Sequence, residues 1–478
     1  MSQVKILEKL FKDWCGEDAK TTQQLPLSGS NRAYYRIQSK HYSAIGVFNE
    51  DTKENWAFIK FTEHFLSKKL NVPKILSQDT ENHCYIQEDL GDDTLFSLLS
   101  KQRNGDEMPS NILHLYLKTV EQLPKFQVIG HENFDYSNSY PRSSFDKQSM
   151  TWDLNYFKYY FLKLAQIPYD EQSLEDDFST FADYLDKIEN NYFLYRDFQS
   201  RNIMIKNNEV WFIDYQGGRR GALQYDLASL LYDAKANLND STRELLLEHY
   251  LDSLQKITFV DRKKFKQQFY AFVLIRILQA MGAYGFRGFY ENKSHFLQSI
   301  PYALKNLKNI LKKLPCELQI PTLTELLNKI CQSERLLNIG SSPTKLCIQI
   351  GSFSFKKGLP SDDSGNGGGF IFDCRALPNP GRLPEFKTLT GMDKEVIDYL
   401  ENHKIIEVFK QHSFSIVDIS VKNYLERGFT NLQINFGCTG GQHRSVYFAE
   451  QLCKHIKKNY DAKIILYHRE QQPKPIVL

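Results

Sequence analysis

The apolar pattern of this chain changes character once, near the segment 340–343, whose sequence is Gly-Ser-Ser-Pro. Before this break, short strand-like runs give way to a long stretch of helical periodicity, whereas strands and helices alternate after it. At 478 residues the chain also exceeds what one hydrophobic core usually supports. We therefore expect two domains, residues 1–320 and 344–478, joined by a linker at 321–343.

The pattern of the first domain predicts two lobes. In the small lobe, residues 1–90, short apolar runs and one helical stretch predict a small sheet with a helix. In the larger lobe, residues 91–320, helical periodicity dominates. One strand pair interrupts it, Asn202–Ile205 and Val210–Asp214, around the polar turn 206–209. The first domain is therefore expected to be of the α+β class.

The second domain reads as a smaller α/β layer that starts with a strand at Lys345–Ile350. A tract near Asp362–Gly369 is rich in Ser, Asp and Gly, which indicates a flexible insertion. The remaining expected strands are Phe370–Asp373, Asn431–Phe436 and Ala462–Tyr467, and the expected helices are Lys394–Asn402, Ser413–Glu426 and Ser445–Lys457.

Composition bounds the environment of the protein. The 60 basic and 57 acidic residues nearly cancel, so no overall field draws the chain to nucleic acid or to a membrane. The eight cysteines are scattered without a C-x-x-C pair, which indicates reduced thiols and a cytoplasmic location. The longest apolar stretch, Phe269–Phe286, contains Arg276 and Gln279, so a buried helix is expected there and no membrane partner.

Three polar residues around the predicted hairpin supply the groups that phosphoryl transfer needs. A carboxylate must orient the acceptor hydroxyl and take its proton, while an amide oxygen and a second carboxylate hold Mg²⁺ at the phosphates. Asp197, Asn202 and Asp214 offer these groups in order, as catalytic base and as two metal ligands. Because a tight turn returns the chain, Asp214 is expected to lie alongside Asn202.

The segments Tyr195–Asn202 and Gly221–Ala228 resemble the catalytic region of the aminoglycoside phosphotransferase-like kinases. The sequence Arg-Asp-Phe at 196–198 is most similar to the branch that phosphorylates the anomeric hydroxyl of N-acetylmuramate and N-acetylglucosamine. Arg276 and the segment 281–283 resemble the late helix of that branch. The resemblance covers residues 1–320 and implies a bilobal protein-kinase-like fold, with ATP and Mg²⁺ as cofactors.

The same resemblance implies two nucleotide-binding segments. The turn at Ser28, Gly29 and Ser30 is similar to the family's phosphate-covering turn, and Glu88, Asp89 and Leu90 are similar to its interlobe hinge. Two departures stand out. The strand 43–48 lacks the lysine with which many kinases bind phosphate, and Tyr195 stands where many relatives have histidine.

From Lys345 onward the chain resembles the C-terminal domain of the RNase adapter RapZ family. The glycine-rich Walker-type loop with lysine that opens true RapZ proteins is absent from this chain, and the kinase-like domain stands in its place. The matching motifs are Ser352–Pro360, Phe372–Pro380, Thr390-Gly391, Gly437–Val446 and His468-Arg469.

The motif 437–446 predicts an anion site on physical grounds. A strand runs into a glycine-rich turn and then a helix, so free N–H groups at the helix start can face an anion. Arg444 adds a guanidinium group that can donate two parallel hydrogen bonds to a phosphate. An alternative is a purely structural turn in which Arg444 pairs with Asp373. The candidate phosphosugar site comprises Gly440, Gly441, Gln442, His443, Arg444, Ser445, Asp373 and Arg375.

Taken together, these features predict an ATP-dependent kinase of cell-wall amino sugars whose C-terminal domain senses a related phosphosugar. A second hypothesis is an RNA-binding regulator, in contact with a small RNA or an RNase, whose kinase-like domain senses ligand without turnover. A third makes the C-terminal domain an assembly module that fixes a homo-oligomer. Aminoglycosides rank below sugars as acceptors.

Overall fold

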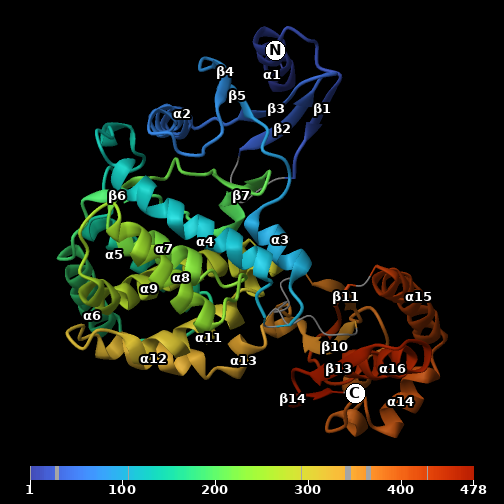
Figure 1. The fold of residues 1–478 in the computed structure, drawn as a ribbon. Coiled ribbons are helices and arrows are strands. Elements are labelled where there is room, and N and C mark those ends of the chain that lie inside the picture. Colours follow the sequence, from blue (N-terminus) through green and yellow to red (C-terminus); the bar gives the residue numbers. More distant parts are fainter. Residues whose placement is uncertain are drawn as a thin grey trace. The chain divides into compact units, whose positions relative to one another are not determined.

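A computed structural model describes residues 2–26, 32–105, 107–291, 293–339, 346–361, 368–427 and 429–477. The chain forms two compact units (Figure 1). The first comprises Met1–Phe286 and Ser299–Ile339, and the second comprises Arg287–Gln298, which holds α10 (Ser294–Leu297), and Gly340–Leu478.

The small lobe of the first unit is a five-stranded antiparallel sheet in the order β1-β2-β3-β5-β4. The helix α1 (Gln3–Cys15) buries Leu7 and Phe11 against this sheet, in a small core that includes Ile37 and Ile86. The strands are β1 (Thr21–Gln24), β2 (Ala33–Gln38), β3 (Ser43–Phe48), β4 (Ile75–Asp79) and β5 (Cys84–Glu88).

The second small-lobe helix, α2 (Thr52–Ser67), starts at Asp51, whose side chain accepts the N–H of Glu54. Its fully buried Phe65 packs against aromatic rings of the large lobe, among them Phe126 and Phe193. The two lobes therefore share an aromatic core through α2.

The large lobe consists mainly of helices, as the periodicity predicts (Figure 1). Its two short sheets are β6 (Tyr192–Leu194) with β9 (Arg219–Gly221) and β7 (Ile203–Lys206) with β8 (Glu209–Phe212). The helices are α3 (Leu95–Gln102), α4 (Ser110–Pro124), α5 (Lys147–Phe157), α6 (Glu171–Asp186), α7 (Leu223–Leu231), α8 (Asp240–Gln255), α9 (Arg262–Gly285) and α11 (Ile300–Ile310).

The predicted hairpin is present as β7 and β8, and Ile203 pairs with Phe212. Asn207 and Asn208 at its turn have positive φ angles of 54° and 60°. Two consecutive left-handed residues make the tight turn that matches the twist of the strands, and Asn adopts this conformation more readily than most residues.

The buried helix predicted at 269–286 is part of α9, which packs against α5 and α7. By length and composition the stretch Arg262–Tyr290 could span a membrane, since its mean hydropathy reaches 1.4. Of that apolar window 67% is buried inside the protein, which is the behaviour of a core helix.

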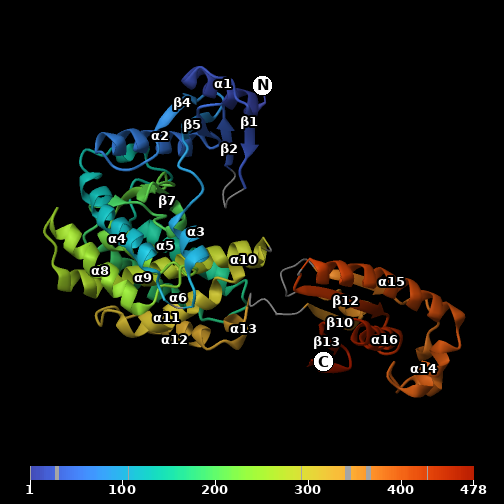
Figure 2. The same cartoon turned by 45° about the vertical axis from the view of Figure 1, so that its right-hand side comes forward.

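The segment 321–339, which the sequence assigned to the linker, belongs to the first unit. It forms α12 (Pro321–Cys331) and α13 (Glu334–Leu337), which lie along α11 and α6 in Figures 1 and 2. The side chain of Asp177 on α6 accepts the N–H of Leu323 at 2.7 Å. Proline at a first helical turn is favourable, so Pro321 opens a helix and not a linker.

The second unit contains a five-stranded sheet in the order β11-β12-β10-β13-β14. The first four strands of this order are parallel, and β14 pairs with β13 in the antiparallel sense. The strands are β10 (Cys347–Ser354), β11 (Gly369–Asp373), β12 (Asn431–Cys438), β13 (Lys463–His468) and β14 (Gln472–Val477).

This unit also contains helices longer than α10, and α16 packs along β10, β12 and β13. The ring of Phe409 on α15 contacts Phe448 on α16, so α15 lies beside α16. Residues 362–367 of the expected flexible insertion lie outside the described residues. The helices are α14 (Lys394–Glu401), α15 (Lys404–Glu426) and α16 (Arg444–Asn459).

We predict that Phe65→Ala lowers the free energy of unfolding by about 3–5 kcal/mol, because a fully buried ring leaves a cavity between the lobes. The matched control is Phe259→Ala, whose ring is 90% exposed and which should change stability by less than about 0.5 kcal/mol. Chemical denaturation of the full chain measures both, and equal losses would contradict the aromatic core.

Candidate functional site

The three residues expected to serve phosphoryl transfer meet at the start of the hairpin. Asn202 Nδ2 lies 3.1 Å from Asp214 Oδ2 and 2.9 Å from the carbonyl oxygen of Asp197. The hairpin thus returns Asp214 to Asn202 as the turn predicts. Burial and the nearby Asp197 carboxylate raise the pKa of Asp214.

The loop that carries Asp197 is anchored by a carboxylate outside the predicted site. Asp226 on α7 is fully buried and accepts the backbone N–H groups of Tyr195 (2.8 Å) and Arg196 (3.0 Å). Burial raises the pKa of Asp226 to about 7, although the two N–H groups favour the charged form. Asp226 lies in the segment 221–228, which the sequence analysis had already compared with the catalytic region of the kinases. That resemblance was therefore a signal by which Asp226 could have been found.

The ring of Tyr195 packs beneath the same loop. Tyr195 is almost fully buried, its ring stands edge-on to Phe198, and its hydroxyl donates to the carbonyl oxygen of Ile213 at 2.5 Å. A hydrogen bond to Ile213 fixes the residue just before Asp214. Tyrosine at this position therefore ties the loop that carries Asp197 to the segment that carries Asp214.

Arg196 and Asp214 have left-handed backbones, with φ angles of 80° and 69°. Such angles are unfavourable for residues with side chains and persist where surrounding contacts impose them. The Arg196 guanidinium is held by Asp153 at 2.6 and 2.8 Å and by the Tyr225 hydroxyl at 2.7 Å. Gln216 Nε2 donates to Asp214 Oδ1 at 2.8 Å.

Arg32 and Glu54 form an ion pair that the sequence analysis missed. Arg32 Nη2 lies 3.0 Å from Glu54 Oε1, and Arg32 Nη1 lies 3.9 Å from Asp214 Oδ1. The Arg32 side chain is only 3% exposed, and within the described residues its Nε has no hydrogen-bond partner. A buried arginine whose N–H has no acceptor can donate a hydrogen bond to a bound anion.

The position of Arg32 follows from strand register. Ala33 pairs with Phe48, so Arg32 flanks the end of β3, the strand that lacks the expected lysine. Glu54 comes from the first turn of α2. The strand paired with β3 offers two arginines: Arg36 lies opposite Ile45, and Arg32 lies just before the strand begins. The sequence alone did not show that Arg32 is the one near Asp214, whereas Arg36 pairs with Asp89.

The predicted hinge residues connect the two lobes. Glu88 ends β5, and its Oε1 accepts from Lys206 Nζ at 2.8 Å, on the large-lobe hairpin. Asp89 accepts from Arg36 and from the Ser43 hydroxyl, and Leu90 is buried. The other expected nucleotide-binding residues, Ser28, Gly29 and Ser30, lie outside the described residues.

The side chains of Asn202 and Asp214 fit a magnesium ion. Mg²⁺ prefers oxygen ligands and is usually held by one or two carboxylates together with water and substrate phosphates. Asn202 uses its Nδ2 to donate, which leaves its amide oxygen for a cation, and Asp214 is 38% exposed. Within the described part of the chain, no three His, Cys, Asp or Glu side chains cluster as a complete metal site.

The second candidate site is the loop 439–443 between β12 and α16. Of the predicted residues, Gly440, Gln442, His443 and Arg444 line a cavity of about 250 Å³ beside this loop, and Gly441, Ser445, Asp373 and Arg375 do not. Residues of the cavity wall that the prediction missed are Asn379, Gly381, Lys387, Cys438 and Thr439.

Arg444 does not form the ion pair with Asp373 that the structural alternative proposed. Its Nη1 donates to the carbonyl oxygens of Arg375 (2.8 Å) and Leu377 (2.9 Å). Asp373 instead pairs with Arg375 at 2.7 Å, and both side chains are about half exposed. The buried guanidinium of Arg444 therefore contacts carbonyl oxygens of this segment and not the carboxylate of Asp373.

The loop is held from both sides. Gln442 Nε2 donates to the carbonyl oxygens of Lys387 and Leu389, and His443 Nε2 lies 2.8 Å from that of Phe386. Gly441 has a φ of 71°, and a Cβ there would lie 2.4 Å from Glu470, so glycine is required.

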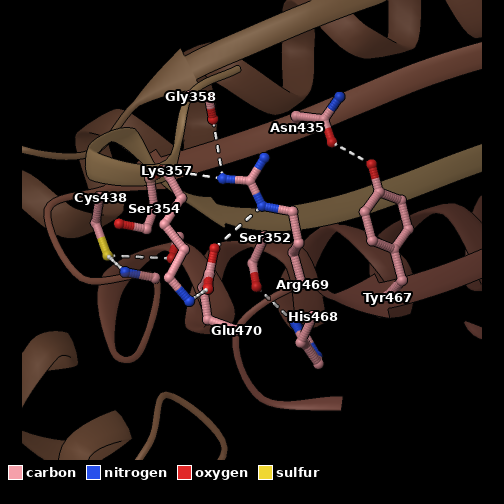
Figure 3. Close-up of polar contacts among 12 residues, drawn as sticks. Ser352, Ser354, Lys357, Gly358, Asn435, Cys438, Tyr467, His468, Arg469 and Glu470 are labelled. Atoms are coloured by element: carbon pink, nitrogen blue, oxygen red, sulfur yellow. Dashed lines mark hydrogen bonds and ion pairs between the residues drawn. The ribbon is translucent and has the colours of Figure 1, made fainter. Parts of the chain in front are cut away.

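A polar network surrounds the end of β10 and contacts the same loop (Figure 3). Arg469 Nη2 donates to the carbonyl oxygens of Ser354 (3.0 Å) and Gly358 (2.9 Å), while Glu470 pairs with Lys357. The Ser354 hydroxyl donates to the carbonyl oxygen of Thr439 at 2.7 Å, which fixes the loop's first residue.

Comparison with known proteins assigns both parts of the chain. Residues 21–260 match the phosphotransferase enzyme family, and residues 346–472 match the RapZ C-terminal domain. The protein therefore belongs to the phosphotransferase enzyme family, since that match covers half of the chain. Behind this domain it carries a RapZ C-terminal domain, and the fold class predicted from the sequence is confirmed.

Curated relatives include a nucleotide-binding protein of Lactobacillus helveticus, 39% identical over 139 residues, which are 29% of this chain and 45% of the relative. A nucleotide-binding protein of Thermosipho melanesiensis is 41% identical over 138 residues, 29% of this chain and 47% of the relative. The chain thus spans less than half the length of these relatives.

Among solved structures, choline kinase LicA from Streptococcus pneumoniae has a TM-score of 0.42 at 18% identity, covering 65% of this chain and 97% of that chain. ADP-bound aminoglycoside phosphotransferase APH(2'')-Ib has a TM-score of 0.43 at 13% identity, covering 70% of this chain and 98% of that chain.

We predict that Asp226→Ala lowers the free energy of unfolding by about 2–4 kcal/mol, because two buried N–H groups lose their acceptor. The control Asp18→Ala removes a side chain that is 82% exposed and should change stability by less than about 0.5 kcal/mol.

Wild type and Asp226→Ala also give a test of how stability depends on pH. The pKa of Asp226 is raised to about 7, so the folded state binds its proton more tightly than the unfolded state. The stability that this proton contributes is present at acidic pH and is lost as the pH rises toward 7. The difference in the free energy of unfolding between wild type and Asp226→Ala should therefore be larger at pH 5 than at pH 8. The opposite trend would contradict the raised pKa of Asp226.

Proposed function

We propose that the first domain transfers a phosphoryl group from ATP to a hydroxyl of an amino sugar such as N-acetylmuramate or N-acetylglucosamine. The observation that supports this is the meeting of Asp197, Asn202 and Asp214 in a chain of the phosphotransferase enzyme family. The Arg-Asp-Phe sequence at 196–198 supports the sugar branch, and choline or aminoglycosides are the other acceptor classes to test.

In this mechanism Asp197 orients the acceptor hydroxyl and takes its proton as the oxygen attacks. Asn202 and Asp214 would hold Mg²⁺, which would supply positive charge to the phosphates. Asp226 and Asp153 keep the loop in place by holding Tyr195 and Arg196. Positioning of this kind is the main contribution that a protein makes to phosphoryl transfer.

Arg32 takes the place of the missing strand lysine in this proposal. Its pairing with Glu54 of α2 sets the guanidinium next to Asp214, where a nucleotide phosphate would meet Mg²⁺. The Nε group without a partner supplies a donor for that phosphate. Loss of the strand lysine therefore does not remove the positive charge that the reaction needs.

For the second domain we propose a phosphosugar-binding site at the loop 439–443. The N–H groups ahead of α16, Arg444 and the exposed Lys387 provide positive potential on one small cavity. A phosphorylated product of the first domain and the ligand of the second would then belong to one chemical class. We place the protein in the cytoplasm, where such sugars are phosphorylated.

The direct test is ATP turnover with Mg²⁺ against N-acetylmuramate, N-acetylglucosamine, other hexoses, choline and aminoglycosides. Asp197→Ala should lower kcat by about 10²–10⁴-fold, since a general base is lost. The exposed Asp18→Ala is the control and should retain activity. Turnover with no acceptor, or an active Asp197→Ala, would favour the RNA-binding regulator, whose RNA affinity should fall steeply with salt.

A second test concerns Arg32. Arg32→Met should raise KM for ATP by about 10–100-fold, because charge-assisted hydrogen bonds to phosphate are worth about 1.5–3 kcal/mol. Arg32→Lys should recover part of this loss, since a point charge remains. Steady-state kinetics at saturating acceptor measure both variants, and an unchanged KM in Arg32→Met would exclude the assigned role.

A further inference from the structure

The sequence of the anion-binding loop contains a residue that binding alone does not explain. Cys438 ends β12, five residues separate it from Arg444, and Ser445 follows in the first turn of α16. Both Cys438 and Arg444 line the 250 Å³ cavity. A thiol therefore lies in the wall of the cavity that we assign to phosphate.

The surroundings of Cys438 stabilise its thiolate. Its Sγ lies 3.1 Å from Ser445 Oγ and 3.2 Å from the backbone nitrogen of Gly441, which donates to it. Although burial opposes ionisation, hydrogen bonds from Ser445, Gly441 and Gln442 lower the pKa of Cys438 below its ordinary value. The Sγ of the neighbouring Cys374 instead faces the Phe372 carbonyl oxygen, and burial raises the pKa of this thiol well above its ordinary value.

The cavity also contains an unused donor for an anion. Arg444 is 4% exposed, and within the described residues its Nε has no hydrogen-bond partner. An unpartnered guanidinium N–H in a buried position is costly unless a ligand accepts it. Lys387 is exposed on the same wall and adds a second cation.

We propose that Cys438 is the nucleophile of a phosphate-monoester hydrolase activity in the second domain, with small phosphosugars as the substrate class. This proposal rests on the phosphate binding proposed above for the same loop. The thiol, the helix N-terminus and Arg444 converge on one cavity, which is the arrangement that attack on a bound phosphoryl group requires. The cavity's small volume favours a phosphorylated monosaccharide over a larger ester.

The reaction has two balanced steps. In the first, the Cys438 thiolate attacks phosphorus, the S–P bond forms, and the bond from phosphorus to the ester oxygen breaks. That oxygen leaves as the alcohol with a proton from the imidazolium of His443. In the second, water attacks phosphorus, the P–S bond breaks, and His443 takes the water's proton, so phosphate and the thiolate are released.

The geometry of His443 suits this proton transfer. Its Nε2 faces the Phe386 carbonyl oxygen, which only accepts, so Nε2 carries a hydrogen in either protonation state. Its Nδ1 lies on the side of Gly381, another residue of the cavity wall. Nδ1 is therefore the nitrogen that exchanges a proton with a bound ester.

The experiment measures phosphate release by the full chain from p-nitrophenyl phosphate and from hexosamine phosphates. ATP is omitted and EDTA is present, so the first domain cannot turn over. Cys438→Ser should lose activity on the order of 10³-fold or more, as removal of a nucleophile does. Cys453→Ser, at 4% exposure against 3% for Cys438, is the matched control and should remain active.

A trapped intermediate identifies the nucleophile directly. Acid quenching during turnover, followed by mass spectrometry, should find a phosphoryl group on Cys438 and on no other cysteine. His443→Asn should slow hydrolysis of the sugar phosphates more than that of p-nitrophenyl phosphate, whose leaving group needs no proton. Hydrolysis that survives in Cys438→Ser, or no phosphate release from any of these esters by the wild type, would overturn the proposal.

Binding of inorganic phosphate, measured by titration calorimetry, separates this result from failure of the proposed function. Cys438→Ser should still bind phosphate, whereas Lys387→Ala should bind it several-fold more weakly. If wild type binds phosphate and hydrolyses nothing, the binding site stands and the nucleophile is refuted. If wild type neither binds phosphate nor hydrolyses esters, both the binding function and the hydrolase fail.

Discussion

The carboxylate of Asp226 is the constraint on which the kinase-like site depends. It holds the two N–H groups that precede Asp197, and these fix a strained Arg196 whose side chain is clamped by Asp153 and Tyr225. Burial of the Asp226 carboxyl group costs free energy, which agrees with its raised pKa. In return, its hydrogen bonds hold the loop in one conformation. The placement of Asp197 therefore rests on α7.

The two proposed phosphate sites share one structural feature. In the first, a buried arginine pairs with Glu54 beside Asp214; in the second, a buried arginine lies at the start of α16 beside a glycine-rich loop. Each arginine has an Nε without a partner within the described residues. Buried donors of this kind indicate ligands, because proteins rarely leave them unsatisfied.

Local signals in the sequence were sufficient for the β7–β8 hairpin and for the pairing of Asn202 with Asp214, since both depend on a turn of a few residues. Long-range contacts were not accessible in this way. The pairing of Arg32 with Glu54 depends on the register of β2 with β3, and the cavity wall at Lys387 depends on how the segment 379–391 folds over the loop. The helices at 321–337 were missed because the linker predicted from the Gly-Ser-Ser-Pro segment at 340–343 was extended back to residue 321.

The use of arginine beside β3 has a consequence for chemical control of the protein. A lysine ammonium can be acylated or carbamylated, and such modification neutralises nucleotide sites that depend on it. The guanidinium of Arg32 stays charged at any physiological pH and does not react with acyl donors, and its side chain is 3% exposed. Metabolic acylation that silences lysine-dependent kinases has no target at this position.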